Sequence, residues 1–192
     1  MSISRRAFLR ASSGLVVSTA ASSVAIPAIA KIASPAIIGV KEMDCRTLAF
    51  ECLRTGERLK TDYWIEGSYV EDALTRINKA LRDFRTGEIH TIEPKLLDLM
   101  NRLGRDVDAR SGFHVISGYR SPATNAMLHE KSSAVATKSL HMKGQAIDLL
   151  VPGRPLDRVH AAALKLRVGG VGYYPKSNFV HVDVGRVRQW TG

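Results

Sequence analysis

Two histidines towards the end of the chain are each accompanied by an aspartate, and these four side chains could do chemistry together. His141 precedes a glycine turn at Gly144, and Asp148 follows it in a strand-like run. Further on, His181 and Asp183 alternate with valines. Two imidazoles and one carboxylate with a fourth position left open form the ligand set of a catalytic zinc site. Spacing alone leaves a second interpretation open, in which the histidines are hydrogen-bonded to each other at a sheet edge.

Strand periodicity indicates which of these side chains can meet. Successive side chains of a strand point to opposite faces, so His181 and Asp183 share one face and the valines between them occupy the other. The valine face is predicted to lie in the core. The opposite face then presents its polar residues on the side where Asp148 can lie. The four other histidines are interpreted as surface, capping or strand-edge residues: His90, His114, His129 and His160.

The elements that must position these residues predict an α+β domain. A β-hairpin is expected first, and apolar residues at helical spacing then predict two helices. Strands and helices follow to the end of the chain. The expected elements are a hairpin over 45–66, a helix over 70–84, a helix from about 93, a strand over 113–118, a helix over 122–131, a loop over 132–144, a strand over 145–151, a helix over 155–168, and closing strands at 171–174 and 178–184. Their order predicts a small antiparallel sheet backed by helices.

The first thirty residues have the composition of an export signal. They contain Arg5, Arg6 and Arg10, no acidic residue, and an apolar run of small residues that closes at Ala30. The run is too weakly hydrophobic for a membrane span, which needs about 20 strongly apolar residues. The segment 4–10 resembles the bacterial twin-arginine signal, which the Tat export machinery recognises. We therefore expect an exported protein whose leader is removed, with an uncleaved anchor as the alternative.

This interpretation divides the chain into three parts and places it in the periplasm. After removal of the leader no membrane-spanning segment is expected. The parts are a signal over 1–30, a linker over 31–44 and a single domain over 45–192.

The expected periplasmic location determines which partners the positive charge of the chain indicates. The formal net charge is +10, and loss of the three leader arginines takes it to +7. Outside the cytoplasm, anionic envelope polymers are more obvious partners than nucleic acid. The chain also lacks the basic stripe with interleaved aromatic residues that is typical of nucleic-acid binders. We therefore expect no nucleic-acid partner.

The two cysteines are expected to stay unpaired. Cys45 and Cys52 bound a strand-like run, and seven strand steps separate their Cα atoms by roughly 23 Å. A disulfide needs a Cα separation under about 7 Å. A bridge would require this segment to fold back on itself.

Three sequence blocks carry a resemblance to a known enzyme group. They are Ser117–Pro122, Ser139–Asp148 and Phe179–Asp183, and they occur in this order. Together they resemble the signature blocks of the LAS metallopeptidases, the zinc D-Ala-D-Ala peptidase group. Within that group the chain is similar to the YcbK/MepK-type murein endopeptidases, through the segment Gly169–Pro175 as well as the leader. The similarity covers about 45–190 and implies a LAS or Hedgehog-N-domain-like zinc peptidase fold.

The resemblance implies roles for individual residues. It implies that His141, Asp148 and His181 bind Zn²⁺. It also implies that Arg120 holds a carbonyl or carboxylate of the substrate and supports the oxyanion, which suits its permanently charged planar fork. A structural ion pair is the alternative role for Arg120. Ser139 is expected to orient the ring of His141.

The chain departs from the wider group where many relatives carry a general base. The positions three and two residues before the last histidine ligand hold Asn178 and Phe179, and neither accepts a proton. Asp183 is expected to be either the base or a partner that orients His181, with another acid or His114 as a further option. Tyr173 and Tyr174 are interpreted first as aromatic packing residues. Donation of a hydrogen bond to the oxyanion by one of them is the secondary interpretation.

The expected function is that of a periplasmic zinc-dependent murein endopeptidase. The resemblance implies hydrolysis of amide bonds in the peptide cross-links of peptidoglycan, including 3-3 cross-links that contain meso-diaminopimelate. The stem peptides of peptidoglycan are then the partners of the mature chain. The alternative is a non-catalytic module that contains zinc and binds peptidoglycan or a protein. The missing base residue favours this alternative.

Overall fold

The computed structural model describes residues 44–132 and 135–192. The predicted leader over 1–30 and nearly all of the predicted linker lie outside the described residues. Within the described ranges, no helix combines the length and the apolar character that crossing a membrane requires.

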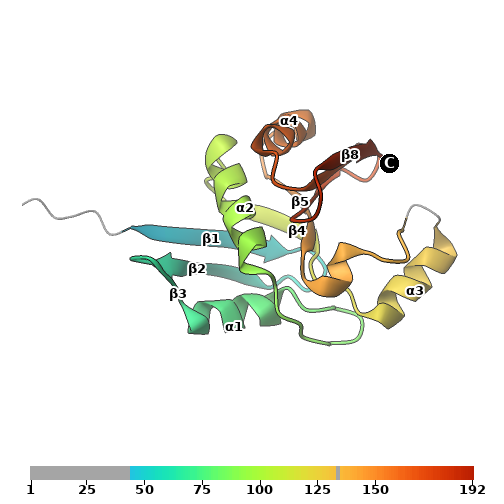
Figure 1. The fold of residues 1–192 in the computed structure, drawn as a ribbon, viewed down its shortest axis with the longest axis horizontal. Coiled ribbons are helices and arrows are strands. Elements are labelled where there is room, and N and C mark those ends of the chain that lie inside the picture. Colours follow the sequence, from blue (N-terminus) through green and yellow to red (C-terminus); the bar gives the residue numbers. More distant parts are fainter. Residues whose placement is uncertain (1–43, 133–134) are drawn as a thin grey trace, which may run out of the picture. The chain divides into compact units, whose positions relative to one another are not determined.

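Eight strands form one mixed sheet in the order β3-β2-β1-β4-β5-β7-β6-β8 (Figure 1). Neighbouring strands are antiparallel except for two parallel pairs, β1 with β4 and β6 with β8. The strand bounds are β1 Cys45–Cys52, β2 Arg58–Ile65, β3 Ser68–Tyr69, β4 Phe113–Ser117, β5 Ala146–Leu150, β6 Gly170–Tyr174, β7 Phe179–Asp183 and β8 Arg188–Thr191. The α+β class is confirmed, but the prediction of a small antiparallel sheet is wrong.

The two parallel pairs have separate causes. The long connection from β3 through two helices returns the chain beside β1 in the same direction, which makes β4 parallel to it. After the hairpin of β6 and β7, the chain crosses to the outer edge of β6, so that β8 is parallel to β6. The sequence predicted neither β3 nor β8, because both are short and lack an alternating apolar pattern.

Four α-helices accompany the sheet. They are α1 (Glu71–Ala80), α2 (Pro94–Asp106), α3 (Pro122–Lys131) and α4 (Leu156–Leu166), and a short 3₁₀ helix, η1 (Leu140–Lys143), precedes β5. The helix α2 packs against β1 and α4, and α4 packs against β6 and β7. Each of these helices presents an apolar stripe to the sheet, as the helical spacing predicted.

The core lies on one face of the sheet and the polar residues of interest lie on the other. Cross-strand pairing aligns buried apolar side chains into a continuous layer under the helices. Its members include Phe50, Phe113, Val115, Leu149, Val180 and Val182. The valine face of β7 is therefore core, as predicted. The opposite face of β5 and β7 carries Asp148 and His181.

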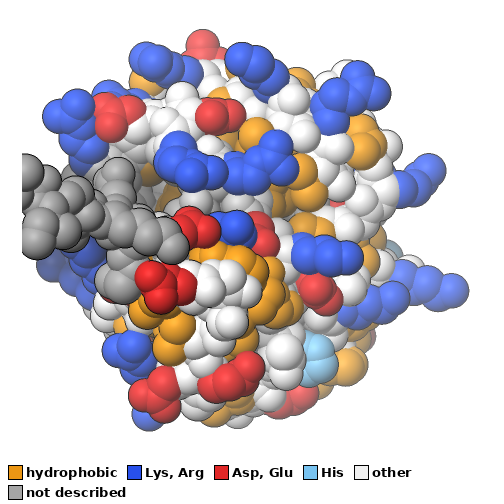
Figure 2. Space-filling view, turned by 60° about the vertical axis from the view of Figure 1, so that its left-hand side comes forward, with side chains coloured by type: hydrophobic (Ala, Val, Ile, Leu, Met, Phe, Trp, Pro, Cys, Tyr) orange, Lys and Arg blue, Asp and Glu red, His pale blue; other side chains and the backbone are white. Residues whose placement is uncertain are grey.

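The basic side chains do not gather into one cluster on the face shown in Figure 2. There, Lys and Arg side chains spread over the surface with Asp and Glu between them. This face therefore presents no single basic patch for one highly charged ligand.

Candidate metal centre

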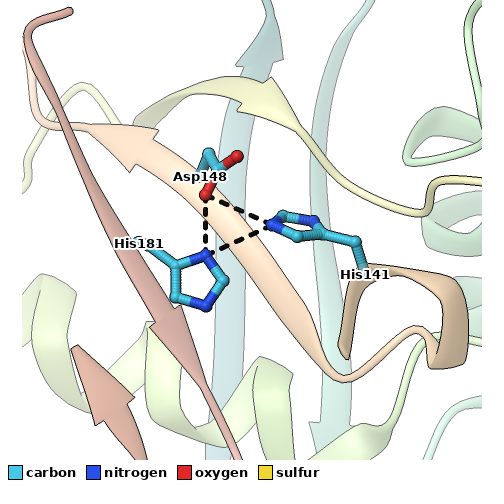
Figure 3. Close-up of side chains that lie close together, drawn as sticks. All are labelled: His141, Asp148 and His181. Carbon is cyan, nitrogen blue, oxygen red and sulfur yellow. Dashed lines mark hydrogen bonds and ion pairs between the residues drawn. The ribbon is translucent and has the colours of Figure 1, made fainter. Parts of the chain in front are cut away.

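Asp148 and His181 lie opposite each other on neighbouring strands, and His141 reaches them from η1 (Figure 3). The Oδ1 atom of Asp148 is 2.8 Å from Nδ1 of His181 and 3.2 Å from Nε2 of His141. The two ring nitrogens are 3.2 Å apart. All three residues are buried. The structure thus brings the three predicted metal ligands together at one point.

A backbone carbonyl determines which nitrogen of His141 faces the other two residues. The Nδ1 atom of His141 lies 2.7 Å from the carbonyl oxygen of Gly118, so a neutral ring carries its hydrogen there and donates it. The other ring nitrogen, Nε2, then directs a lone pair at Asp148 and His181. Ser139, expected to orient the ring, contacts the backbone of His141 instead. Its hydroxyl oxygen accepts from the backbone N–H of His141 at the start of η1.

The second imidazole is oriented by a carboxylate. Nε2 of His181 is 3.2 Å from Oδ2 of Asp183, which accepts its hydrogen. In a neutral ring, Nδ1 is then the atom with a free lone pair, and it faces Asp148. The two rings and Asp148 therefore present three acceptors to one another. Such a group needs a cation between its members, either a proton on His181 or a metal ion.

The donor set fits a tetrahedral zinc ion. Ligand atoms about 2.0–2.1 Å from zinc in a tetrahedron lie roughly 3.3 Å from one another. The three contacts of 3.2, 3.2 and 2.8 Å are close to that separation. The outer nitrogen of each ring is also bound, by Gly118 and by Asp183, as is usual for histidines that ligate metals. The group is therefore able to hold a metal ion.

Burial and charge act in opposite directions on the pKa values of the three groups. Burial lowers the pKa of His141. Burial alone would also lower the pKa of His181, but the carboxylates of Asp148 and Asp183 outweigh it and raise the pKa to about 9. Burial would raise the pKa of Asp148, yet its contacts with the two imidazoles hold that pKa well below the ordinary value. Asp148 is thus ionised and ready to bind a cation.

Arg120 stands beside this group with hydrogen-bond donors to spare. Its side chain is largely buried, and Nη2 lies 3.5 Å from Oδ2 of Asp148 and 3.3 Å from Oγ of Ser117. A third contact joins Nη1 to Asn125 at 3.5 Å, and Nε is buried without a partner. These long contacts leave the two Nη groups of the guanidinium able to bind an additional acceptor.

The loop that carries Arg120 is held by a buried aspartate that the sequence analysis did not identify. Asp83 accepts from the backbone N–H groups of Ser121 and Arg85, both at 2.9 Å. Burial would raise the pKa of Asp83, but hydrogen bonds from Thr124 and Ser121 outweigh it and lower the pKa to about 2. Ser121 in turn caps α3 by accepting from the N–H of Thr124. The carboxylate therefore fixes the turn between β4 and α3.

Asp183 is saturated with hydrogen bonds on the far side of His181. It is fully buried and accepts from the backbone N–H groups of Gly170 and Gly185, both at 2.8 Å. Arg188 adds an ion pair, with Nη2 2.7 Å from Oδ2. Burial would raise the pKa of Asp183, but the hydrogen bond with His181, followed by those from Arg188 and the two backbone N–H groups, holds it well below its ordinary value. Of the two roles left open for Asp183, this geometry favours orientation of His181 over proton transfer.

Strand β8 reaches this site because the two β6 residues between it and β7 at this point are glycines. Gly170 and Gly172 lie between β7 and β8 in the register. A Cβ atom on Gly170 would meet Arg188 at 2.3 Å, and one on Gly172 would meet the indole of Trp190 at 2.6 Å. The two glycines thus let Arg188 cross to Asp183 and let Trp190 lie against His181, with ring centroids 5.2 Å apart. The sequence analysis missed both β8 residues, and the alternating glycines were the signal.

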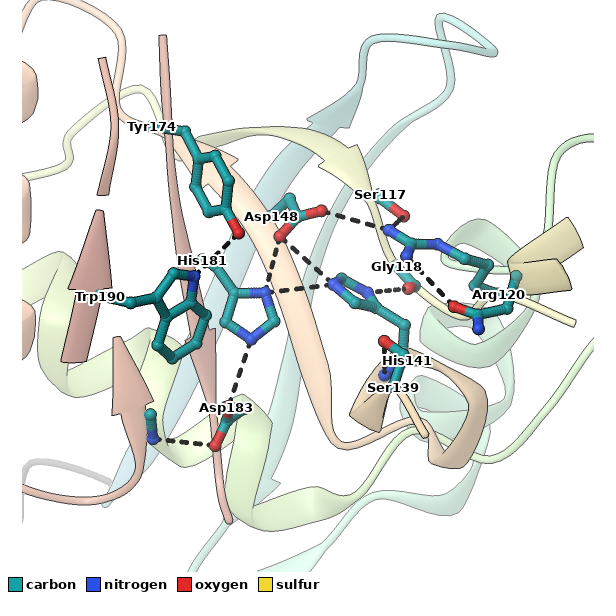
Figure 4. Close-up of polar contacts among 12 residues, drawn as sticks. Ser117, Gly118, Arg120, Ser139, His141, Asp148, Tyr174, His181, Asp183 and Trp190 are labelled. Atoms are coloured by element: carbon teal, nitrogen blue, oxygen red, sulfur yellow. Dashed lines mark hydrogen bonds and ion pairs between the residues drawn. The ribbon is translucent and has the colours of Figure 1, made fainter. Parts of the chain in front are cut away.

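An open cavity of about 590 Å³ leads to the group. His141, Asp148, His181 and Arg120 line it, together with Tyr174 and Trp190 (Figure 4). Among the described residues of its lining, Asp148, His141 and His181 provide the only side-chain carboxylate and imidazole groups. His114, considered as an alternative base, lies instead on β4 beside Glu51, at 3.9 Å. The cavity has room for a segment of a polymer, and its lining contributes no further proton acceptor of these two kinds.

The cysteines are free, as expected from their separation along an extended strand. They occupy the two ends of β1.

Fold and site together define an α+β protein with a buried His-Asp-His group, suited to a metal ion, at the base of an open cavity. A family model described as "Peptidoglycan L,D-endopeptidase MepK" matches residues 40–190. The chain belongs to this family.

Curated relatives agree with this assignment. Peptidoglycan L,D-endopeptidase MepK of Escherichia coli (strain K12) is 41% identical over 157 residues, which cover 82% of this chain and 86% of the relative. The MepK of Shigella flexneri matches equally well. A probable peptidoglycan L,D-endopeptidase MepK of Haemophilus influenzae is 42% identical over 148 residues, covering 77% of this chain and 80% of the relative. No solved structure matches the chain significantly.

Proposed function

We propose that this protein is a zinc-dependent endopeptidase of the periplasm that hydrolyses amide bonds in peptidoglycan cross-links. The observation that carries the proposal is the convergence of His141, Asp148 and His181 on one point of an open cavity, beside Arg120. The names of the relatives, which describe peptidoglycan L,D-endopeptidases, support the substrate class. Within peptidoglycan, the family resemblance suggests that the preferred substrates are cross-links that contain meso-diaminopimelate.

The export prediction completes the proposal. A twin-arginine signal over 1–30 and a linker over 31–44 would deliver the domain over 45–192 to the periplasm by the Tat machinery. The charge of +7 left after removal of the leader arginines suits an anionic cell wall. Support for this step comes from the sequence of the leader.

Each residue of the site has a part in the proposed reaction. His141, Asp148 and His181 would hold Zn²⁺, which lowers the pKa of a bound water and polarises a carbonyl. Arg120 would bind the substrate peptide through its loosely engaged Nη groups. Asp183 would orient His181, and the Gly118 carbonyl would orient His141. Arg120 and the metal together would place the scissile carbonyl over the buried group.

One observation favours a second candidate, a zinc-containing module that binds peptidoglycan or a protein without cleaving it. Within the described lining of the cavity, the only side-chain carboxylate and imidazole groups are those of the metal-ligand candidates. A binding module needs no additional proton acceptor, whereas hydrolysis requires the proton of the water to be taken up. Enzymatic assays separate the two candidates.

The test is digestion of purified sacculi by the mature chain, with and without a chelator. The proposal predicts release of muropeptides that chelation abolishes and added Zn²⁺ restores. Asp148→Asn should abolish release while the variant stays folded, whereas Asp62→Asn, an exposed residue of β2, should leave it unchanged. Binding of sacculi without any release by the wild type would favour the binding module and reject the endopeptidase.

A further inference from the structure

Two neighbouring tyrosines of β6 point to opposite faces of the sheet. Tyr173 lies on the helix side, where its ring stacks on His160 of α4 with centroids 4.7 Å apart. Tyr174 lies on the cavity side, where its ring stacks on Phe179 at 4.4 Å. The pair therefore offers one tyrosine inside the site and a matched one outside it.

The hydroxyl of Tyr174 is held as an acceptor, which leaves its proton unused. The indole N–H of Trp190 lies 2.8 Å from Oη of Tyr174. An indole nitrogen only donates, so Oη accepts this hydrogen bond. In the described part of the chain, no hydrogen bond uses the hydroxyl's own proton. Trp190 therefore orients the hydroxyl and leaves its O–H free to donate to a ligand.

The free O–H lies on the other side of the buried group from Arg120. Figure 4 shows the hydroxyl of Tyr174 pointing towards His181 and Asp148 from β6, with the Arg120 guanidinium beyond Asp148. The two residues line the same cavity. A carbonyl placed over the buried group would have donors on both sides.

We propose that Tyr174 donates a hydrogen bond to the oxyanion that develops on the scissile carbonyl, and that Trp190 acts as the positioning residue for its hydroxyl. This inference rests on the proposed endopeptidase function. A donor aimed at charge that appears only in the transition state acts on kcat more than on KM. The cation–π contact of Arg188 with Trp190, at 4.9 Å, and the glycine surface of β6 keep the indole in place.

The first test compares Tyr174→Phe with Tyr173→Phe on a soluble cross-linked muropeptide dimer. Tyr174→Phe keeps the ring that stacks on Phe179 and removes only the hydroxyl. Its kcat should fall roughly a hundredfold, the scale of one lost oxyanion donor, with KM changed less than threefold and metal content unchanged. Tyr173→Phe should match the wild type. A normal kcat in Tyr174→Phe, or a change in KM alone, would overturn the proposal.

The second test asks whether Trp190 acts through the hydroxyl. Trp190→Phe removes the indole N–H and keeps an aromatic ring over Gly172. It should lower kcat in the wild-type background but have little further effect when Tyr174 is already phenylalanine. Equal effects of Trp190→Phe in both backgrounds would assign it a structural role and reject positioning through Tyr174.

A third measurement does not depend on activity. The chain has two tryptophans, Trp64 and Trp190, so an NMR spectrum contains two indole N–H signals. Trp64 Nε1 is buried without a partner, whereas Trp190 has Tyr174. In Tyr174→Phe only the Trp190 signal should shift upfield, and an unmoved signal would refute the hydrogen bond. A wild type that cleaves nothing would refute the proposed function instead, whatever the spectra show.

Discussion

The two imidazoles of the candidate metal centre are held by different means. His141 is oriented by the main chain, because its outer nitrogen donates to the carbonyl of Gly118. His181 is oriented by a charged side chain, Asp183, which Arg188 and two backbone N–H groups hold in turn. One side of the site is thus built from a loop and the other from strands β6, β7 and β8.

This difference indicates which substitutions should disturb the orientation of each imidazole. A backbone carbonyl cannot be removed by substitution, so the loop side depends on the contacts that fix the loop. Backbone hydrogen bonds of Tyr119 and Arg120 contribute, and Asp83 adds a side-chain acceptor that substitution can remove. The strand side depends on a buried carboxylate and on the two glycines of β6 that leave room for Arg188 and Trp190. Its vulnerable residues are therefore Asp183 and the glycine at 172.

The largest effect is expected for Asp183→Asn on the strand side. The substitution removes the charge that pairs with Arg188 and weakens the acceptor of the His181 N–H. We expect zinc affinity to fall about 10–100-fold, as for other partners of metal-ligating histidines. The free energy of unfolding should fall by about 2–3 kcal/mol, less than for a fully buried pair because Arg188 is partly exposed. Chelator competition and urea unfolding measure the two quantities.

The control for this variant is Asp62→Asn, which should change neither quantity. Unchanged zinc affinity in Asp183→Asn would show that His181 does not depend on its outer partner. The proposed difference between the loop side and the strand side would then be wrong.

An intermediate effect is expected for Asp83→Asn on the loop side. The folded-state pKa of about 2 lies below the ordinary value of 3.8, so ionised Asp83 stabilises the fold above about pH 4. This stabilisation is lost as the pH falls from about 4 towards 2. The variant should be about 2 kcal/mol less stable at pH 7, and the difference should shrink towards pH 2. Urea unfolding across this pH range measures it.

Asp106→Asn, an exposed residue of α2, serves as the control and should stay within about 0.5 kcal/mol of the wild type at every pH. A stability difference for Asp83→Asn that is the same at pH 7 and pH 2 would contradict the proposed source of the stabilisation.

The smallest effect is expected for Gly172→Ala, which sharpens the account of β6. Its Cβ would meet the indole of Trp190 at 2.6 Å and displace it from His181. Overpacking of this kind should cost about 1–2 kcal/mol and shift the indole N–H signal of Trp190. The measurements are thermal unfolding and NMR.

Gly153→Ala provides a control with a similar loss of stability and a different cause. Its Cβ meets nothing within 4 Å, but its positive φ of 71° makes alanine unfavourable by about 1 kcal/mol. The Trp190 signal should not move in this variant. The same spectrum in both variants would mean that β6 does not control the position of the indole.

The convergence of His141, Asp148 and His181 could be predicted from their spacing together with the family resemblance, because part of its geometry is local or periodic. Strand alternation placed His181 opposite the valine face, and the turn at Gly144 brought His141 back towards Asp148. The sheet order could not be predicted, since parallel pairing of β1 with β4 depends on how two helices return the chain. Strand β8 was not predicted, because its polar residues form no strand pattern by themselves and become interpretable only beside the glycines of β6.

The partners of the ligands were harder to predict than the ligands. Asp83 contacts residues nearly forty positions away in the sequence, and no periodic pattern links it to the loop of Arg120. The carbonyl of Gly118 carries no side-chain signal at all. Asp183 was identified from strand alternation, but only the contacts from Arg188 and β6 separate an orienting role from that of a base.

Titration of the metal-free mature protein with Zn²⁺, followed by calorimetry, tests the central claim most directly. The account predicts one zinc ion per chain in the wild type and in His114→Gln, and no comparable binding in His141→Ala or Asp148→Asn. Equal zinc binding in all four proteins, or none in the wild type, would show that His141, Asp148 and His181 do not form a metal site.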